Sequence, residues 1–298
     1  MSALSSTVEL MPGVSISRVG AGLWRVTQWG MSRRELARFI EQCVELGVTS
    51  FDLADIYGGG HAEAVFGDAL AASPHLSNSV QIITKAGIRP ASGAQVKHYD
   101  SSEAHLRRSV EQSLRAFRRD QLDVFLLHRP DPLLDPIELA EAAERLLKEG
   151  KIGAFGVSNF GAREFDWLND LMPIATNQIS FSPFDCGPLE NGQLTALAQS
   201  NVTPMIWSPL GGGRLFDTTD SASERVRAAM KMIQRERGMQ DWISVAYAWV
   251  FRLPTRPIVL TGTRRIDGIR NALRGAETEL RRDEWFSIFE AARGGPID

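Results

Sequence analysis

Hydrophobic residues recur along this chain at two alternating spacings, one typical of helices and one typical of buried strands. Residues 32–35, Ser-Arg-Arg-Glu, have the pattern of a capping box, and apolar residues then fall on one helical face until Gly47. These apolar positions are Leu36, Phe39, Ile40, Cys43 and Val44. An apolar run from Val48 to Asp52 follows at once, so the pattern predicts a helix and then a buried strand.

The same alternation continues through the chain. Asp135-Pro136 predicts a helix start, and Gly150 predicts the end of that helix before the next strand. The expected strands cover residues 19–24, 48–52, 80–84, 122–127, 152–157, 174–178, 203–207 and 257–261. Eight strand-then-helix units with buried, non-alternating strands favour a (β/α)8 TIM barrel over an open doubly wound sheet. No linker-like stretch divides residues 1–298, so we expect one domain.

Three segments lie outside these units. Residues 8–16 alternate in hydrophobicity around Pro12-Gly13, which predicts a small hairpin that plugs the amino-terminal end of the barrel. A glycine-rich stretch from Gly211 to about Ser223 predicts a long loop on the side where barrels bind ligands. Near the carboxyl end, residues 283–285, Asp-Glu-Trp, predict the start of an extra helix.

Composition narrows the class of protein. The 298 residues are 43% hydrophobic with a net charge of −3, and the absence of a long basic run argues against nucleic acid as a partner. Residues 1–11 lack the pattern of a secretory signal, and no apolar run approaches the roughly 20 residues of a spanning helix. We therefore expect a cytoplasmic protein without a membrane partner, in which Cys43 and Cys186 are reduced. No histidine shows metal-ligand spacing, so no metal site is predicted.

Four ionisable side chains stand at the ends of three successive predicted strands. Asp52 ends the strand at 48–52, and Tyr57 follows five residues later in a glycine-rich turn. Lys85 and His128 end the next two strands. Because the carboxyl ends of barrel strands and the loops after them form the ligand-binding face, we expect the four groups to meet in one cleft.

An acid, a phenol, an ammonium and an imidazole together suit the reduction of a carbonyl. This reaction needs a hydride donor, which no side chain supplies, and a proton donor for the oxygen. Tyr57 is the predicted proton donor, and Lys85 is expected to stabilise its phenolate. Asp52 is expected to hold Lys85 charged, and His128 to hydrogen-bond the carbonyl oxygen. Each residue alone has a structural alternative, as a cap, an ion-pair partner, a surface ring or a buried histidine, whereas carbonyl reduction explains all four.

Together with further segments, these residues resemble the aldo-keto reductase superfamily. The segments are residues 156–160 (Gly-Val-Ser-Asn-Phe), 177–178 (Asn-Gln) and 207–214 (Trp-Ser-Pro-Leu-Gly-Gly-Gly-Arg). They occur in the order of the family between about Gly20 and Asn271. Residues 98–100, 128–132 and 211–216 further resemble a bacterial branch of oxidoreductases. The resemblance implies a barrel, NAD(P)H-dependent carbonyl reduction and the same four catalytic roles.

Cofactor contacts are expected on the last barrel strands, because no G-x-G-x-x-G follows the first strand to form a Rossmann cradle. Ser158, Asn159 and Gln178 can offer amide and hydroxyl groups to the nicotinamide carboxamide. Trp207 can stack on the nicotinamide ring, with a core aromatic as its alternative. The pyrophosphate is expected along Ser208, Leu210, Gly211, Gly212, Gly213 and Arg214.

The segment Gly262-Thr263-Arg264-Arg265 opens the last predicted barrel helix. A helix amino terminus beside guanidinium groups suits a 2′-phosphate, so we expect NADPH, with NADH as the alternative. Relatives often carry Gln at the position of Gly268 and Glu-Asn where this chain has Asn-Ala at 271–272. The adenine contacts therefore stay open, and Arg264 could equally be a solvated surface charge.

Trp24, Trp29, Tyr99 and Phe160 are expected to wall a substrate pocket, with core or lid positions as the alternative. The predicted substrate is a small-molecule aldehyde or ketone. Two other functions stay open: a Schiff-base lyase or aldolase that uses Lys85, and a non-catalytic nucleotide-binding regulatory protein. The pattern predicts no particular oligomeric state.

Overall fold

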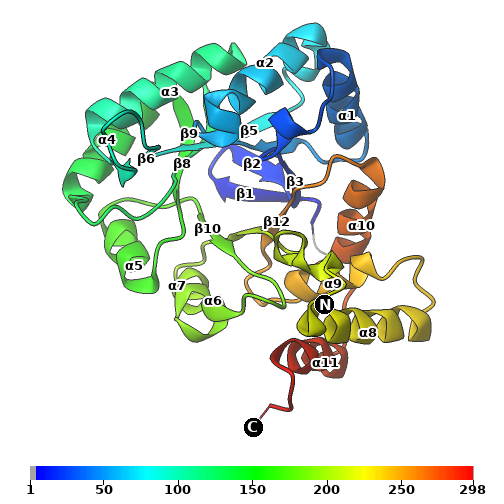
Figure 1. Ribbon diagram of the computed structural model, residues 1–298. Coiled ribbons are helices and arrows are strands. Elements are labelled where there is room, and N and C mark those ends of the chain that lie inside the picture. The colour runs from blue at the N-terminus through cyan, green and yellow to red at the C-terminus, as the bar shows by residue number, and fades with distance from the viewer. Residues whose placement is uncertain (1–4, 298) are drawn as a thin grey trace.

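A closed barrel of parallel strands stands at the centre of the structure, a computed structural model that describes residues 5–297 (Figure 1). The strands pair in chain order, and the last pairs with the first. Their bounds are β3 (Val19–Gly22), β4 (Ser50–Asp52), β5 (Gln81–Ala86), β8 (Leu122–Leu127), β9 (Ile152–Ser158), β10 (Asn177–Ser180), β11 (Met205–Trp207) and β12 (Ile258–Thr261). This arrangement confirms the predicted (β/α)8 barrel.

Helices surround the barrel on all sides (Figure 1). The α-helices are α1 (Arg33–Glu45), α2 (Ala62–Ala72), α3 (Glu103–Phe117), α4 (Pro136–Lys148), α5 (Ala162–Leu171), α6 (Gly187–Glu190), α7 (Gln193–Gln199), α8 (Ser221–Glu236), α9 (Ile243–Phe251), α10 (Ile266–Glu277) and α11 (Arg282–Arg293). Short 3-10 helices are η1 (Val26–Gln28), η2 (Tyr57–Gly60), η3 (Pro74–Leu76) and η4 (Gly211–Phe216). Within residues 5–297, none of the helices has the length and apolar character needed to cross a membrane.

Local capping explains where the outer helices begin. At α1, Ser32 Oγ accepts a hydrogen bond from the backbone N of Glu35 at 3.3 Å, and Glu35 Oε2 accepts one from the backbone N of Ser32 at 2.7 Å. This confirms the predicted capping box. At α4, Asp135 Oδ1 accepts from the backbone N of Ile137 at 2.8 Å, one residue after the proline that opens the helix.

Several element bounds differ from the predicted ones. β5 continues to Ala86, so Lys85 lies inside the strand and not after it. β10 begins at Asn177, although Ala175 N still donates to the carbonyl of Phe155 at 2.8 Å. The stretch predicted as a long loop contains η4, and α8 already begins at Ser221. The apolar pattern marks which residues are buried, and the regular strand covers only part of each buried run.

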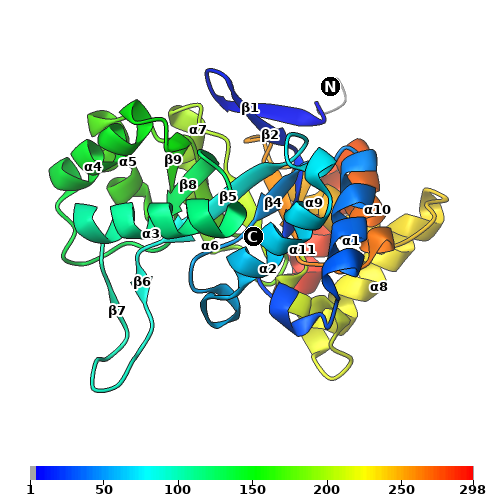
Figure 2. The same ribbon diagram turned by 90° about the horizontal axis from the view of Figure 1, so that it is seen from above.

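An amino-terminal hairpin closes one end of the barrel. It consists of antiparallel β1 (Thr7–Met11) and β2 (Val14–Ser17). Val8 and Ile16 belong to the same buried apolar cluster as the barrel residues Ile83 and Val124. Figure 2 shows the hairpin opposite an arm formed by β6 (Ile88–Arg89) and β7 (His98–Tyr99), which extends from the carboxyl end of β5. The hairpin therefore plugs the amino-terminal end, as predicted, and leaves the carboxyl ends of the strands for ligands.

The extra carboxyl-terminal helix packs against α8 (Figure 1). Arg237, at the end of α8, donates from Nε to Glu284 Oε1 at 2.7 Å. Arg225 Nε donates to the carbonyl of Ala291 at 2.9 Å. These contacts fix α11 (Arg282–Arg293), which starts one residue before the predicted Asp283.

Helices α2 and α3 approach each other closely at Gly67. A Cβ atom at this position would lie 1.9 Å from the carbonyl oxygen of Ala116. That oxygen belongs to the backbone of α3, so it cannot rotate away as a side chain would. Glycine is thus required for the contact between these two helices.

Gly67→Ala is expected to lower the free energy of unfolding by about 2 kcal/mol, because the added methyl group forces α2 away from α3. Gly295→Ala is the matched control, since a Cβ there meets no atom within 4 Å. Its expected effect is below about 0.5 kcal/mol. Urea unfolding followed by circular dichroism measures both variants, and equal midpoints would contradict the close contact.

Candidate active site

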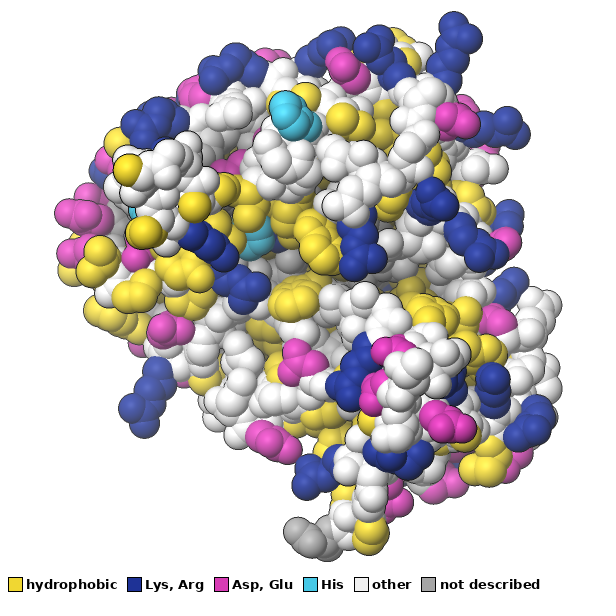
Figure 3. Space-filling view, viewed as in Figure 1, with side chains coloured by type: hydrophobic (Ala, Val, Ile, Leu, Met, Phe, Trp, Pro, Cys, Tyr) yellow, Lys and Arg dark blue, Asp and Glu magenta, His cyan; other side chains and the backbone are white. Residues whose placement is uncertain are grey.

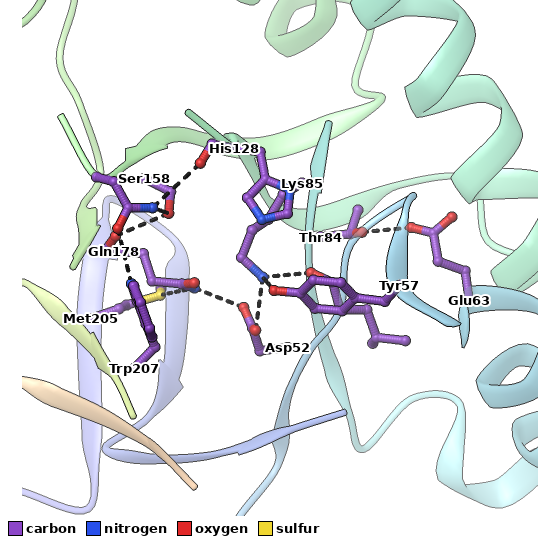
Figure 4. Close-up of polar contacts among 12 residues, drawn as sticks. Asp52, Tyr57, Glu63, Thr84, Lys85, His128, Ser158, Gln178, Met205 and Trp207 are labelled. Carbon is purple, nitrogen blue, oxygen red and sulfur yellow. Dashed lines mark hydrogen bonds and ion pairs between the residues drawn. The ribbon is translucent and has the colours of Figure 1, made fainter. Parts of the chain in front are cut away.

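Three neighbouring strands bring the four predicted catalytic side chains together at the carboxyl end of the barrel (Figure 4). Asp52 is the last residue of β4, Lys85 lies in β5, and His128 directly follows β8. Tyr57 comes from the loop after β4, where it begins η2. Because β4, β5 and β8 are adjacent and parallel, residues far apart in sequence meet at one edge of the sheet.

The ammonium of Lys85 is the centre of this group. Its side chain is fully buried and donates to Asp52 Oδ2 at 2.8 Å, to the Leu53 carbonyl at 2.6 Å and to the Tyr57 hydroxyl at 3.3 Å. An ammonium has three N–H donors and no acceptor, so these three oxygens satisfy it completely. The phenol of Tyr57 is thereby tied to a buried ion pair.

Burial and the contacts of Lys85 have opposite effects on the pKa values of Lys85 and Tyr57. Burial alone lowers the pKa of Lys85, but Asp52 and Tyr57 raise it, and the net pKa is raised. For Tyr57, burial raises the pKa more strongly than the Lys85 ammonium lowers it. The net lowering of the phenol pKa that the sequence pattern suggested is therefore not found. Tyr57 is held protonated, which a proton donor requires.

Asp52 is held through its second oxygen as well. Gln178 Nε2 donates to Asp52 Oδ1 at 2.7 Å, and the same nitrogen lies 3.7 Å from Met205 Sδ (Figure 4). The spacing of these residues in the sequence gave no signal for this contact, since 126 positions separate the two partners. The predicted role of Gln178 beside the nicotinamide carboxamide stays a prediction.

The His128 imidazole lies next to the Tyr57 ring. The two ring centres are 5.7 Å apart, and the ring planes are inclined at 77°. The imidazole is buried, and its Nδ1 has no hydrogen-bond partner in the described part of the chain. Burial lowers the pKa of His128 to about 2, with further lowering by Lys85, Arg129 and Lys97. The ring is therefore neutral near pH 7 and can donate one hydrogen bond from its protonated nitrogen.

Ser158, Asn159 and Trp207 form a connected polar unit at the ends of β9 and β11. Asn159 Nδ2 donates to Ser158 Oγ at 2.8 Å, and Trp207 Nε1 donates to Asn159 Oδ1 at 3.2 Å. Asn159 has a φ of 62°, a left-handed conformation that costs a non-glycine residue about 1–3 kcal/mol. Strain of this kind is concentrated at ligand sites, which supports the predicted contact of this unit with the nicotinamide.

The segment after β11 is a series of left-handed residues. Ser208, Gly211, Gly212 and Gly213 have φ values of 55°, 62°, 65° and 106°. A Cβ atom at Gly213 would meet no atom within 4 Å, so this backbone borders open space next to Leu210–Gly212. Arg214 is held at the end of the segment, because its Nε donates to Asp220 Oδ2 at 2.6 Å.

The start of α10 carries the residues expected at the 2′-phosphate. Thr263 Oγ1 accepts from the backbone N of Arg265 at 3.1 Å, which forms the turn that follows Gly262. A Cβ at Gly268 would lie 2.6 Å from Thr263 Oγ1, so glycine at this position makes room for the threonine. Arg264 Nη1 donates to the carbonyl of Trp29 at 2.9 Å, which leaves the other donors of its guanidinium for a ligand.

The four aromatic residues expected around the substrate occupy different environments. Trp24 is 57% exposed, and the Arg25 guanidinium lies 4.6 Å from its ring centre. Tyr99 pairs with Ile88 on the β6–β7 arm and is partly exposed. Trp29 and Phe160 belong to the buried core, which was the alternative for these two rings. A role as pocket wall stays a prediction for Trp24 and Tyr99.

The face that carries these residues is hollowed over the centre of the barrel (Figure 3). A histidine and hydrophobic side chains lie in the hollow, and basic side chains stand on both sides of it. Separate surface cavities of about 610 and 280 Å³ lie next to α1 and between Phe184 and Phe289, away from the catalytic side chains. The barrel mouth is therefore the place where the predicted chemistry can meet a substrate.

The sequence pattern did not single out two acids near Lys85, the buried Glu63 and the partly buried Asp55. Glu63 Oε1 accepts from Thr84 Oγ1 at 2.5 Å and from Ser113 Oγ at 2.9 Å. Asp55 Oδ1 is buried without a hydrogen-bond partner among residues 5–297. Burial, and then the nearby Glu63 carboxylate, raise the pKa of Asp55 to about 7. An acid between apolar positions of a helix, as at Glu63, is the sequence signal that would have revealed the pair.

The free energy of unfolding of Asp55→Asn, relative to that of the wild type, is expected to increase as the pH rises from 5 to 8. The folded-state pKa of Asp55, about 7, exceeds the unfolded value of about 3.9, so the wild type loses stability as pH rises between these values. The variant lacks this loss and should gain about 2–3 kcal/mol across the range. Thermal unfolding at several pH values measures it, with Asp166→Asn, exposed on α5, as the control. A pH-independent difference would contradict the assignment.

Known proteins resemble this chain in sequence and in fold. The aldo/keto reductase family matches residues 18–293. The chain is 41% identical over 286 residues to the oxidoreductase YdhF of Escherichia coli, with 95% of each protein covered. It is 40% identical over 297 residues to a 6-dehydroglucose reductase of Agrobacterium fabrum, with 97% of this chain and 99% of that protein covered.

Among solved structures, the glycerol dehydrogenase of Gluconobacter oxydans superposes with a TM-score of 0.82 at 25% identity, and 98% of each chain is covered. The fold, the buried Asp-Lys-Tyr-His group and the extent of these matches lead to one conclusion. The chain belongs to the aldo/keto reductase family and is an NAD(P)H-dependent oxidoreductase.

Proposed function

We propose that this protein is a cytoplasmic, single-domain enzyme that reduces aldehydes or ketones to alcohols with NADPH, and that Tyr57 is the proton donor. The observation that carries the proposal is the hydrogen bond between the Lys85 ammonium and the Tyr57 hydroxyl, at 3.3 Å, inside a buried ion pair with Asp52. A phenol in this position can release a proton and leave a phenolate next to a fixed positive charge.

Each side chain of the site has its own role in the proposed reaction. A bound nicotinamide supplies the hydride that reaches the carbonyl carbon. Tyr57 gives its proton to the carbonyl oxygen as negative charge develops there, and Lys85 stabilises the phenolate that remains. Asp52, held from its far side by Gln178, keeps the ammonium in place. Neutral His128 hydrogen-bonds the carbonyl oxygen and fixes the position of the substrate.

The groups around the mouth fit a nicotinamide dinucleotide. The unit formed by Ser158, Asn159 and Trp207 offers a hydroxyl, an amide and a flat ring for the carboxamide and the nicotinamide. The open backbone at Gly213 leaves room for a pyrophosphate, which glycine can approach closely. The guanidinium of Arg264 at the start of α10 supports NADPH over NADH.

The lyase alternative receives no support from the environment of Lys85. An amine that forms a Schiff base must be neutral and accessible, whereas this ammonium is fully buried with a raised pKa. All three of its N–H groups are directed at protein oxygens. A lysine in this state stabilises a neighbouring charge and does not attack a carbonyl.

The name of one relative widens the substrate class that we propose. The Agrobacterium fabrum protein, 40% identical to this chain, is a 6-dehydroglucose reductase. We therefore add sugar aldehydes to the small-molecule aldehydes and ketones that the sequence predicts. An assay panel for this protein should contain all of these kinds of carbonyl compound.

Tyr57→Phe is expected to lower kcat by about a hundredfold or more while the Kd for NADPH stays within about twofold, because the proton donor is lost and no proposed cofactor contact is changed. NADPH oxidation with the aldehyde panel gives kcat, and tryptophan fluorescence gives the Kd. Tyr247→Phe, which removes a buried hydroxyl bonded to Thr261, is the control and should keep its kcat within about threefold.

Two outcomes would contradict the proposal in different ways. Loss of NADPH binding in Tyr57→Phe would show that the phenol belongs to the cofactor site. Tight NADPH binding by the wild type without oxidation by any aldehyde would favour the regulatory alternative.

Arg264→Ala is expected to raise the Kd for NADPH about tenfold and to change the Kd for NADH by less than about twofold, because only NADPH carries a 2′-phosphate. Fluorescence titration with both nucleotides measures this difference. Arg270→Ala is the matched control, because Arg270 lies on α10, just after Arg264 in the chain, and is paired with Asp267. Equal changes for both nucleotides in Arg264→Ala would show that the 2′-phosphate lies elsewhere.

A further inference from the structure

Arg129 is a charged residue at the barrel mouth that the proposed mechanism does not use. It follows His128 directly and is partly buried. The carbon at the centre of its guanidinium lies 6.0 Å from the centre of the Trp207 ring. Across residues 5–297, the structure gives Arg129 neither an ion pair nor a hydrogen bond. An arginine next to an aromatic face without a carboxylate keeps its N–H donors available for a ligand.

The charge of Arg129 is felt by both groups that face the carbonyl. It contributes to lowering the pKa of His128 and opposes the rise in the pKa of Tyr57. Lys97, exposed on the β6–β7 arm, adds a second positive charge that acts on His128. Figure 3 shows basic side chains at the edge of the hollow, next to the histidine. The positive charge therefore lies where a substrate enters.

The acids near the mouth do not balance this charge. Asp52 is already paired with the Lys85 ammonium at 2.8 Å. Asp131, two residues after Arg129, accepts hydrogen bonds from the backbone N of Ser101 at 3.2 Å and from its hydroxyl at 2.9 Å. Neither carboxylate forms an ion pair with the guanidinium of Arg129 in the described part of the chain.

Barrel geometry separates the backbone of Arg129 from the expected 2′-phosphate site. Arg129 follows β8, and the predicted 2′-phosphate site follows β12. In the closed order β3, β4, β5, β8, β9, β10, β11, β12, these two strands lie four places apart, on opposite sides of the ring. The backbone of Arg129 is thus on the side of His128, and its guanidinium lies 6.0 Å from the centre of the Trp207 ring, at the nicotinamide end of the expected cofactor site.

We propose that Arg129 is a specificity residue that binds an anionic group, a carboxylate or a phosphate, of the carbonyl substrate. This inference rests on the proposed carbonyl reduction and names its substrate class: oxo acids, or aldehydes that carry a phosphate. The planar guanidinium can hold either anion through two parallel hydrogen bonds, which an ammonium cannot do.

Matched pairs of aldehydes test the inference at saturating NADPH. One pair is 4-carboxybenzaldehyde and benzaldehyde, and the other is glyceraldehyde 3-phosphate and glyceraldehyde. For each pair, the measured quantity is the ratio of kcat/KM for the charged compound to kcat/KM for the neutral one. The pair with the larger wild-type ratio tells whether carboxylate or phosphate is the preferred anion.

In Arg129→Gln, the larger ratio is expected to fall by about tenfold or more, because a charge-assisted pair is lost only for the anionic aldehyde. Arg129→Lys should give an intermediate ratio, since it keeps the charge without the planar fork. Lys97→Gln should have a smaller effect that disappears at high salt, because its charge is exposed. Arg34→Gln, an exposed arginine on α1, is the control and should keep the wild-type ratio.

Three results would overturn the inference. The first is a wild-type ratio near one for both pairs. The second is an Arg129→Gln variant that keeps the wild-type ratios. The third is a rise in the Kd for NADPH in that variant as large as the fall in the ratio, which would assign Arg129 to the cofactor.

Failure of the proposed function gives a different result and leaves this inference testable. If the wild type reduces no aldehyde of either pair, carbonyl reduction is wrong for these compounds. Tryptophan fluorescence then compares the Kd of 4-carboxybenzyl alcohol with that of benzyl alcohol in the presence of NADP+. A preference for the carboxylate that is lost in Arg129→Gln supports the anion site, and equal Kd values in the wild type overturn it.

Discussion

A fully buried ammonium is the constraint on which the rest of this site depends. A charge without water is unstable in a protein interior unless its donors are satisfied and an opposite charge is close. Lys85 meets both conditions through Asp52, the Leu53 carbonyl and the Tyr57 hydroxyl. All three partners belong to the end of β4 and the loop after it. The ion pair that keeps Lys85 charged therefore also fixes the loop that carries the phenol.

Strand register explains why two neighbouring residues of β5 have different roles. Lys85 belongs to the candidate active site, and Thr84 bonds to a surrounding helix. β4 and β5 pair so that Asp52 stands opposite Ile83, which is buried in the barrel interior. Lys85, two residues further, points to the same interior side, whereas Thr84 between them points outward and bonds to Glu63. Because side chains alternate in direction along β5, the same strand places the Lys85 ammonium at the mouth and connects the barrel wall to helix α2.

The parts of the site that were predictable from sequence are those set by the backbone. The helical and strand patterns place Asp52, Lys85 and His128 at strand ends, and barrel closure then brings them together. The contact of Gln178 with Asp52 was not predictable, because it depends on two side-chain conformations across the barrel. Trp29 was ambiguous for a different reason: an apolar ring next to a loop suits a core as well as a pocket, and only packing decides.

Burial and the positive charge at the mouth together favour Tyr57 over His128 as the acid of the proposed mechanism. A histidine with an ordinary pKa would be partly protonated near pH 7 and would compete with the phenol as a proton donor. Burial together with Lys85, Arg129 and Lys97 lowers the pKa of His128 to about 2, so its ring can donate a hydrogen bond but holds no extra proton. In the proposed mechanism, proton transfer is then left to Tyr57. The Arg129 cation that we propose as the binding site of an anionic substrate therefore acts together with burial to keep the proposed roles of Tyr57 and His128 apart.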